Sequence, residues 1–212
     1  MDLNIKTFLP LRRRNRNVIF VGERNRVKLP GADLTNSPWE CLNNKTLFHS
    51  KSVIFSSTDF SNVLDWAERH NAQHILLGCV VNAKHVAEAA VDLAREAKRD
   101  ICIVECGDPE DEDATVDNIG STVIARSLQE MGCRVEGQVD RRIQKIRSKD
   151  ILALVSQSVQ AAILRSLGFA EDVRICCELN KINIVPRLAE GAITSFNRGL
   201  RRLTKNPKKR RL

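Results

Sequence analysis

The sequence lacks tyrosine and has no long run of apolar residues. Among its 212 residues only 4% are aromatic, which argues against a nucleic-acid reader that stacks bases on aromatic side chains. No stretch approaches the ~20 consecutive apolar residues of a membrane span, and the first residues lack the apolar run of a secretory signal. We therefore expect a soluble, cytoplasmic protein that makes no membrane contact.

Metal-binding cysteine pairs are also missing. None of the seven cysteines forms a CxxC pair or has histidine partners at zinc-finger spacing, which argues against a zinc site. An odd number of cysteines without a secretory signal indicates reduced thiols. A chain of this length, with 42% apolar residues, can bury a core without disulfides or a structural metal.

The net charge of +8 is concentrated at the two ends of the chain. Residues 1–28 hold eight basic and two acidic residues, and residues 198–212 hold eight basic residues and no acidic one. The part between them carries 18 basic and 24 acidic residues and is mildly acidic. We predict a basic N-terminal segment over 1–16, one domain over 17–197 and a basic tail over 198–212. The tail is either simply solvated or contacts nucleic acid, which would make a nuclear location possible.

Apolar runs alternate with helical spacing along the central part. The runs that predict strands are 18–22, 53–55, 75–81 and 101–104, followed by two short late strands at 173–177 and 182–185. Apolar residues at helical spacing predict helices over 60–67, 83–97, 116–131 and 152–163. This order predicts an α/β fold, a largely parallel sheet flanked by helices with a mixed edge. Ligands in such folds bind at the carboxyl ends of the strands.

Two loops after predicted strands carry side chains suited to phosphate and a hard cation. Glu23 and Asp33 offer carboxylate oxygens of the kind that magnesium accepts, and Arg24 and Ser37 could bind phosphate oxygens. The second loop, 56–61, leads from a strand into a helix, where hydroxyls and free N–H groups favour an anion. Ordinary turns and a helix N-cap at Asp59 or Ser61 explain the same residues.

Two further features could bind ions or cap a helix. Five carboxylates lie within residues 108–113, just before a predicted helix. The helix dipole favours one or two of them, and a cation is the alternative partner for the rest. Asn82 stands where it can cap the helix that begins at 83.

Taken in order, these segments resemble the 2-phosphosulfolactate phosphatase family. Glu23 followed by Gly31-Ala32-Asp33-Leu34-Thr35-Asn36-Ser37-Pro38 is similar to the family's Gly-Glu and Gly-Phe-Asp-x-Gly-Asn-Ser-Pro segments. Val80-Val81-Asn82-Ala83 resembles its Leu-Asn-Ala helix start. Residues 167–176 and Val185-Pro186 resemble its closing region. The similarity runs from about residue 18 to 191.

The resemblance implies a magnesium-dependent phosphatase associated with coenzyme M biosynthesis. Its substrate is a small anionic phosphate monoester, which it hydrolyses to sulfolactate and phosphate. The implied catalytic residues are Asp33, Asn36 and Thr58, and the implied metal ligands are Glu23, Asp33 and Asp117. The implied substrate-binding residues are Arg24, Ser37, Ser57 and Asn82. The hypothesis requires oxygen-bearing side chains from separate turns to converge on one Mg²⁺.

Departures from the family pattern support an alternative. The family's N-terminal Asp-x-Leu-Arg-Ala-Thr-Ser-Thr segment has no counterpart, and Phe60 replaces a glycine that would let phosphate approach the backbone. Gln160-Ala161 stands for a His-Gly, and Asn180 for an Asp. The alternative is an inactive paralogue with a degenerate active site, acting as a binding or scaffold protein. A homo-oligomer or a partner chain would then cover a bare sheet edge.

Overall fold

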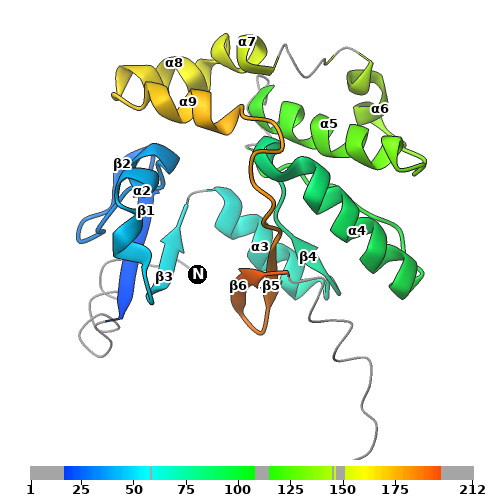
Figure 1. Ribbon diagram of the computed structural model, residues 1–212, viewed down its shortest axis with the longest axis horizontal. Helices are drawn as coiled ribbons and strands as arrows, with labels where there is room; N and C mark the ends of the chain where they lie inside the picture. The colour runs from blue at the N-terminus through cyan, green and yellow to red at the C-terminus, as the bar shows by residue number, and fades with distance from the viewer. Residues whose placement is uncertain (1–16, 58, 108–114, 145, 147–150, 197–212) are drawn as a thin grey trace, which may run out of the picture. The chain divides into compact units, whose positions relative to one another are not determined.

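The computed structural model describes residues 17–57, 59–107, 115–144, 146 and 151–196, and combines helices with small sheets (Figure 1). The chain divides into two compact units. The first contains Met1–Ala72, Cys106–Asp117 and Leu152–Cys177, and the second Gln73–Glu105, Asn118–Ile151 and Glu178–Leu212. Thr58, the acidic run 108–113 and the basic segments 1–16 and 198–212 lie outside the described residues.

A three-stranded mixed sheet forms the centre of the first unit. Its order is β2-β1-β3, in which β1 (Val18–Arg24) pairs in parallel with β3 (Ser52–Ser56) and antiparallel with β2 (Val27–Lys28). The structure confirms the strands predicted at 18–22 and 53–55. The intervening loop also contains α2 (Pro38–Asn43) and a 3-10 helix, η1 (Lys45–Phe48).

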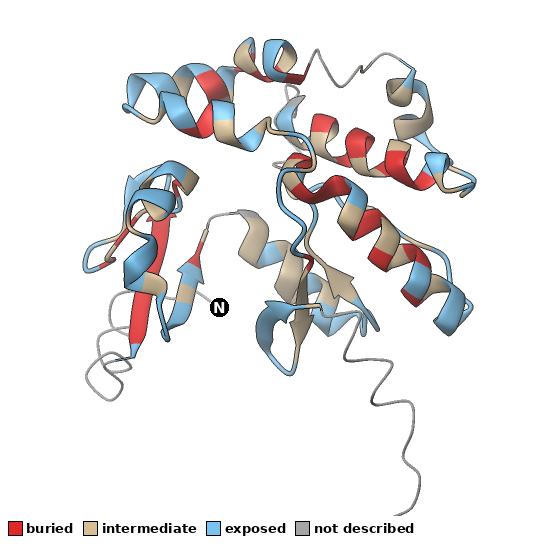
Figure 2. Ribbon diagram, in the orientation of Figure 1, coloured by how far each residue is buried: buried red, intermediate tan, exposed pale blue. Residues whose placement is uncertain are grey.

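Strand β1 is buried on both faces, and Figure 2 shows it red along almost its whole length. Val18 and Phe20 pack with Ala32 on one face, whereas Ile19 and Val21 pack with Leu34 on the other. Alternate residues of a strand point to opposite faces, so this continuous apolar run fits a position covered on both sides. Loop residue Leu34 also forms a parallel bridge with Val21, beside β1.

Helices complete the first unit. The predicted helix at 60–67 is found as α3 (Asp59–Arg69). The helix predicted over 152–163 is two helices, α7 (Ile151–Ser156) and α8 (Val159–Ser166), because Ser158 adopts an extended conformation and its side chain caps α8.

The strand predicted at 173–177 is wrong, because the segment forms helix α9 (Ala170–Cys176). This helix packs against α8 and α2. A short apolar run does not distinguish a strand from a buried helix, and here helix packing buries Val173 without a ladder partner.

The second unit contains a small antiparallel sheet. Its order is β4-β5-β6, formed by β4 (Ile75–Leu76), β5 (Pro186–Ala189) and β6 (Ala192–Ser195). Strand pairing is therefore mixed in one sheet and antiparallel in the other, and the expected largely parallel sheet is not confirmed in the described residues. The α/β class itself is confirmed.

Two other predicted strands of this unit form no ladder in the described residues. Residues 101–104 have no regular secondary structure, yet Ile101 and Ile103 pack against the apolar core of the unit. The predicted strand at 182–185 is also irregular, and β5 begins directly after it at Pro186. Val185 is buried against Val86 and Ala89, whereas Ile182 and Ile184 are exposed, so the apolar pattern of 182–185 is only partly satisfied by packing.

Two long helices build the core of the second unit. A short 3-10 helix, η2 (Val80–Asn82), leads into α4 (Ala83–Ala97), and the others are α5 (Thr115–Glu130) and α6 (Gln138–Ile143). Ala87 and Val91 of α4 pack with Leu128 of α5, and Val86 and Ala89 pack with Val185. The structure confirms the helices predicted at 83–97 and 116–131. Gly132 follows the second one with a positive φ of 84°.

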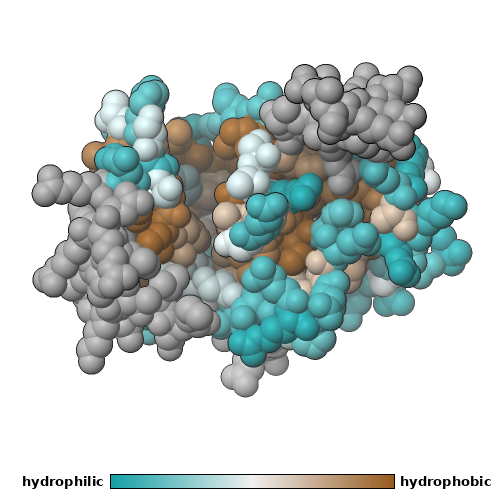
Figure 3. Space-filling model, turned by 90° about the horizontal axis from the view of Figure 1, so that it is seen from below, coloured by the Kyte–Doolittle hydropathy of each residue, from teal (hydrophilic) through white to brown (hydrophobic). Residues whose placement is uncertain are grey.

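Both units also expose apolar side chains, and the brown areas of Figure 3 show apolar residues at the surface. Trp39 and Leu42 are exposed in the first unit, and Ile184 and Ile193 in the second. In the described part of the chain, no helix is both long and apolar enough to cross a membrane.

Candidate functional site

The carboxyl ends of β1 and β3 lie side by side. Gly22 is in register with Ser56, so Glu23 and Ser57 follow at the same edge of the sheet. A Cβ atom at Gly22 would lie only 2.9 Å from the Ser56 carbonyl oxygen, which explains why the strands approach so closely at a glycine. Ser57 is half-buried and Arg24 is exposed.

Glu23 is a buried carboxylate near the end of β1. Its Oε2 accepts a hydrogen bond of 2.6 Å from the Arg26 N–H, in the two-residue turn that joins β1 to β2. Asn25 and Arg26 both have positive φ there, 51° and 65°, as a tight hairpin turn requires. The structure thus keeps Glu23 close to the backbone of the hairpin.

Asp33 lies along the edge of β1. Its Oδ2 accepts a 2.9 Å hydrogen bond from the Phe20 N–H, and its own N–H donates to the Phe20 carbonyl at 2.8 Å. The half-buried Asp33 thus exchanges two hydrogen bonds with the Phe20 backbone, as a residue of a neighbouring strand would, except that its carboxylate takes the place of a backbone carbonyl. Phe20 precedes Glu23 by three residues, which is about 10 Å along a strand.

These carboxylates fit magnesium by the type of their donor atoms. In proteins Mg²⁺ is usually held by one or two carboxylates together with water and substrate phosphate, rather than by a complete protein cage. Within the described ranges there is no group of three or more His, Cys, Asp or Glu side chains arranged to hold a metal. The convergence of three carboxylates on one ion therefore stays a prediction.

A network of hydrogen bonds shapes the loop that follows Asp33. Glu40 Oε2 accepts hydrogen bonds from the Thr35 N–H at 2.7 Å and from the Thr35 hydroxyl at 2.5 Å. Thr35 Oγ1 in turn accepts from the Ser37 N–H at 3.1 Å. Asn36 lies between these two anchored residues and is exposed.

Ser37 caps α2 and binds a carboxylate from far along the chain. Its buried hydroxyl accepts from the Glu40 N–H at 3.0 Å and donates to Asp172 Oδ1 at 2.8 Å. The same Asp172 oxygen accepts from the Trp39 N–H at 2.8 Å. The only proton of the Ser37 hydroxyl is thus committed to Asp172, so a phosphate would have to compete for it.

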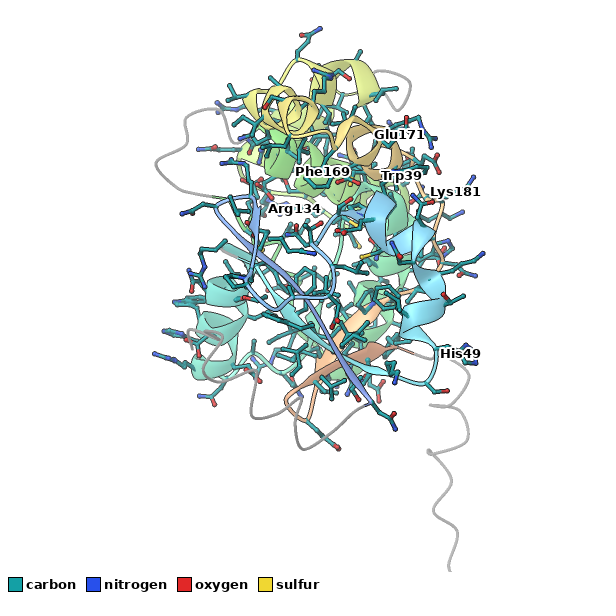
Figure 4. The ribbon with its side chains drawn as sticks, turned by 90° about the vertical axis from the view of Figure 1, so that its left-hand side faces the viewer. Trp39, His49, Arg134, Phe169, Glu171 and Lys181 are labelled. Atoms are coloured by element: carbon teal, nitrogen blue, oxygen red, sulfur yellow. The ribbon has the colours of Figure 1, made fainter. Side chains whose placement is uncertain are left out.

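Asp172 itself is buried in α9. Figure 4 shows Trp39 of α2 beside Glu171 of α9, where the two helices meet. The surroundings also affect the thiol of Cys41 on α2. Burial, followed by the negative charges of Glu40 and Asp172, raises the pKa of Cys41 above its ordinary value.

Asn82 has a structural environment in the second unit. Its buried side chain accepts from the Cys79 N–H at 2.9 Å and donates to the carbonyls of Leu77 at 3.2 Å and Ile184 at 3.1 Å. Asn82 occupies the N-cap position of α4 as expected, but its side chain makes no capping bond to that helix. Asn180 supplies that acceptor instead, taking the Lys84 N–H at 2.8 Å.

The remaining predicted site residues are placed as follows. Asp117 is half-buried in the first turn of α5, and a Cβ atom at Gly107 would lie 2.7 Å from its Oδ2. Phe60 is half-buried on α3 and makes an edge-to-face contact with Phe55, with ring centroids 6.3 Å apart. Thr58, a predicted catalytic residue, lies outside the described residues.

The first unit thus holds every described site residue that we predicted except Asn82. Within it, Glu23, Arg24 and Ser57 share the carboxyl edge of the sheet, and Asn36 and Ser37 share the loop before α2. Asn82 belongs to the second unit. The roles of these residues in metal and substrate binding stay predictions.

Two polar arrangements escaped the sequence-based predictions. The first is the anchoring of the Asn36 loop by Glu40 and Asp172. The Ser-Pro-x-Glu spacing of residues 37–40 is a helix-start signal that could have indicated Glu40, whereas nothing local indicates Asp172.

The second arrangement lies in the other unit, where Glu105 Oε1 accepts from the Ser121 hydroxyl at 2.5 Å and from Arg142 at 2.7 Å. Arg142 also donates to Asn118.

Comparisons with known proteins agree with the resemblance. A family model described as 2-phosphosulpholactate phosphatase matches residues 3–191. The 2-phosphosulfolactate phosphatase of Methanocaldococcus jannaschii is 33% identical over 177 residues, covering 80% of this chain and 72% of the relative. A probable 2-phosphosulfolactate phosphatase of Carboxydothermus hydrogenoformans is 30% identical over 193 residues, covering 90% of this chain and 76% of the relative.

A third relative, from Thermus thermophilus, is also named a probable 2-phosphosulfolactate phosphatase. It is 30% identical over 178 residues, covering 82% of this chain and 72% of the relative. None of these comparisons lends support to the alternative of an inactive paralogue.

Proposed function

This chain belongs to the 2-phosphosulpholactate phosphatase family, and from that premise we propose that it hydrolyses 2-phosphosulfolactate to sulfolactate and phosphate. The observation that carries the proposal is the match of the family model over residues 3–191, together with the archaeal relative of that name, 33% identical over 80% of this chain. In the net reaction water adds to phosphorus, the ester P–O bond breaks, and the sulfolactate oxygen takes up a proton.

The edge of the first sheet supports this chemistry. Glu23 and Ser57 follow strands that are parallel and in register, and the carboxyl ends of parallel strands are the usual place for a phosphate ligand in α/β folds. The cationic Arg24 adds a group whose fork of donors matches phosphate oxygens. We assign phosphate binding to Arg24 and Ser57, and orientation of the ester to Asn36.

Glu23 and Asp33 would hold the magnesium ion, for which their side chains would have to turn toward each other from the backbone N–H groups of Arg26 and Phe20 that they now accept from. Both offer the hard oxygen atoms that this ion prefers, and the burial of Glu23 limits competition from bulk water. When bound, Mg²⁺ would neutralise charge on the phosphoryl oxygens. Asp117 could supply a further oxygen.

Phosphate release from 2-phosphosulfolactate tests the proposal, measured with Mg²⁺ and with excess chelator. We expect turnover that requires Mg²⁺ and falls at least about a hundredfold in Glu23→Gln and Asp33→Asn, because charge stabilisation dominates phosphoryl transfer. Both amides keep an oxygen for the backbone N–H groups of Arg26 and Phe20, so the local fold is preserved.

The matched control is Glu68→Gln on α3, an exposed position of the same charge and size. Turnover that is unaffected by the chelator would refute the magnesium assignment. Absence of phosphate release from the unmodified chain under all these conditions would refute the phosphatase function itself.

A further inference from the structure

We propose that Asp172 is a positioning residue: it fixes the loop that presents Asn36 by holding the Ser37 hydroxyl and the Trp39 N–H on a single carboxylate oxygen. The catalytic meaning of this role rests on the proposed phosphatase function, in which Asn36 orients the ester. The fixing of the loop itself does not depend on that function and can be measured separately.

The geometry defines which atom of Asp172 acts. Oδ1 accepts both hydrogen bonds, each 2.8 Å long, and the residue is buried. A buried carboxylate is costly unless hydrogen bonds satisfy it, and these two donors come from the turn that starts α2. Because Asp172 lies 135 residues after Ser37, the contact ties two distant parts of the chain together.

Both ends of the Asn36 loop are anchored by carboxylates. Glu40 holds Thr35 through its N–H and its hydroxyl, and Asp172 holds Ser37. The Ser37 N–H also donates to Thr35 Oγ1 at 3.1 Å, which joins the two anchors across the loop. Asn36, exposed between them, is thereby presented on a backbone that Thr35 and Ser37 hold in place.

A comparison of Asp172→Ala with Asp172→Asn separates positioning from direct chemistry. The Asn side chain keeps an acceptor oxygen for both donors but loses the negative charge. For a positioning residue we expect kcat/KM for phosphate release to fall about 10- to 100-fold in Asp172→Ala, since a displacement near 1 Å can cost about a hundredfold. We expect Asp172→Asn to stay within about threefold of the unmodified chain.

Ser158→Ala provides the matched structural control. Ser158 is buried in the same unit and caps α8 through the Ala161 N–H at 3.1 Å, and its hydroxyl donates to the Val155 carbonyl rather than to the Asn36 loop. It should destabilise the unit without changing kcat/KM of the folded protein. All variants are assayed at a temperature where circular dichroism shows each of them folded.

Amide hydrogen exchange over residues 35–40 measures how firmly the loop is held, without any substrate. We expect at least a tenfold loss of protection in Asp172→Ala, and near-normal protection in Asp172→Asn and Ser158→Ala. If Asp172→Ala does not fold, Asp172→Leu takes its place, because its branched side chain has a similar shape but offers no oxygen to the Ser37 hydroxyl or the Trp39 N–H.

Two results would overturn the proposal, and a third concerns only the phosphatase function. Unchanged exchange at residues 35–40 in Asp172→Ala overturns the proposal. Loss of turnover in Asp172→Asn equal to that in Asp172→Ala also overturns it, because the charge itself would then act as a metal ligand or base. If the unmodified chain releases no phosphate, the proposed function fails, and the exchange measurement still decides whether Asp172 fixes the loop.

Discussion

Replacement of Asn82 tests how the second unit is held together. Its buried amide joins the Cys79 N–H to the carbonyls of Leu77 and Ile184, so it connects the end of β4, the start of η2 and the segment before β5. We compare Asn82→Ala, which removes the side-chain hydrogen bonds, with Asn82→Asp, which keeps the shape but exchanges the donor group for an oxygen.

The size of each effect follows from these bonds. An unpartnered buried donor or acceptor costs about 1–3 kcal/mol, and partial access of water to the two carbonyls reduces their share. We expect Asn82→Ala to lower the free energy of unfolding by about 2–4 kcal/mol. Asn82→Asp should be worse at neutral pH, because its carboxylate would face the carbonyl oxygens of Leu77 and Ile184.

Urea denaturation between pH 5 and 8 measures this difference, with Asn62→Asp on the exposed side of α3 as the control for added charge. Lowering the pH should restore part of the stability lost in Asn82→Asp, since a protonated carboxyl group regains a donor. Equal stability of Asn82→Asp and the unmodified chain would refute the structural role. If the variant then lost only substrate affinity, the predicted role of Asn82 in substrate binding would be supported instead.

Three further predictions concern packing, backbone and titration. Phe20→Ala in the core of the first unit should cost about 3–5 kcal/mol in urea denaturation. Phe55→Ala should cost clearly less, because Phe55 is 42% exposed. Equal losses would contradict the assignment of Phe20 to the core and of Phe55 to the surface. Gly22→Ala should lower the free energy of unfolding by about 1–3 kcal/mol, because the added Cβ would meet Ser56. Gly120→Ala in α5 should raise it by about 0.4–1 kcal/mol, because a Cβ there meets nothing within 4 Å. Thermal melts in which Gly120→Ala is the less stable of the two variants would contradict this reasoning. Burial raises the pKa of Cys41 and of Cys177 above 9.0, so the unfolded chain loses these protons first and stability should fall as the pH rises above about 9. That fall should diminish in the double variant Cys41→Ala with Cys177→Ala, and an unchanged slope would exclude the two thiols as its source.

The local pattern of apolar residues predicted secondary structure correctly in segments with a clear strand or helix periodicity. The run from Val18 to Gly22 is apolar at every position, which is typical of a strand covered on both faces, and it forms β1. Helical spacing over 83–97 likewise predicted α4. The same reasoning failed at 173–177, because a short, mostly apolar run fits either a strand or a helix. Here the segment forms a helix, which packs against α2 and α8.

The sequence by itself determined the strand β1, the main helices, the loop carrying Asp33 to Pro38, and the family to which the chain belongs. Only the tertiary structure decided what the polar residues of those segments touch. Asp172 meets Ser37 across 135 positions and Asn82 meets Ile184 across 102. Such pairs form because a buried polar group must find a partner wherever the folded chain provides one, and no local spacing encodes that choice.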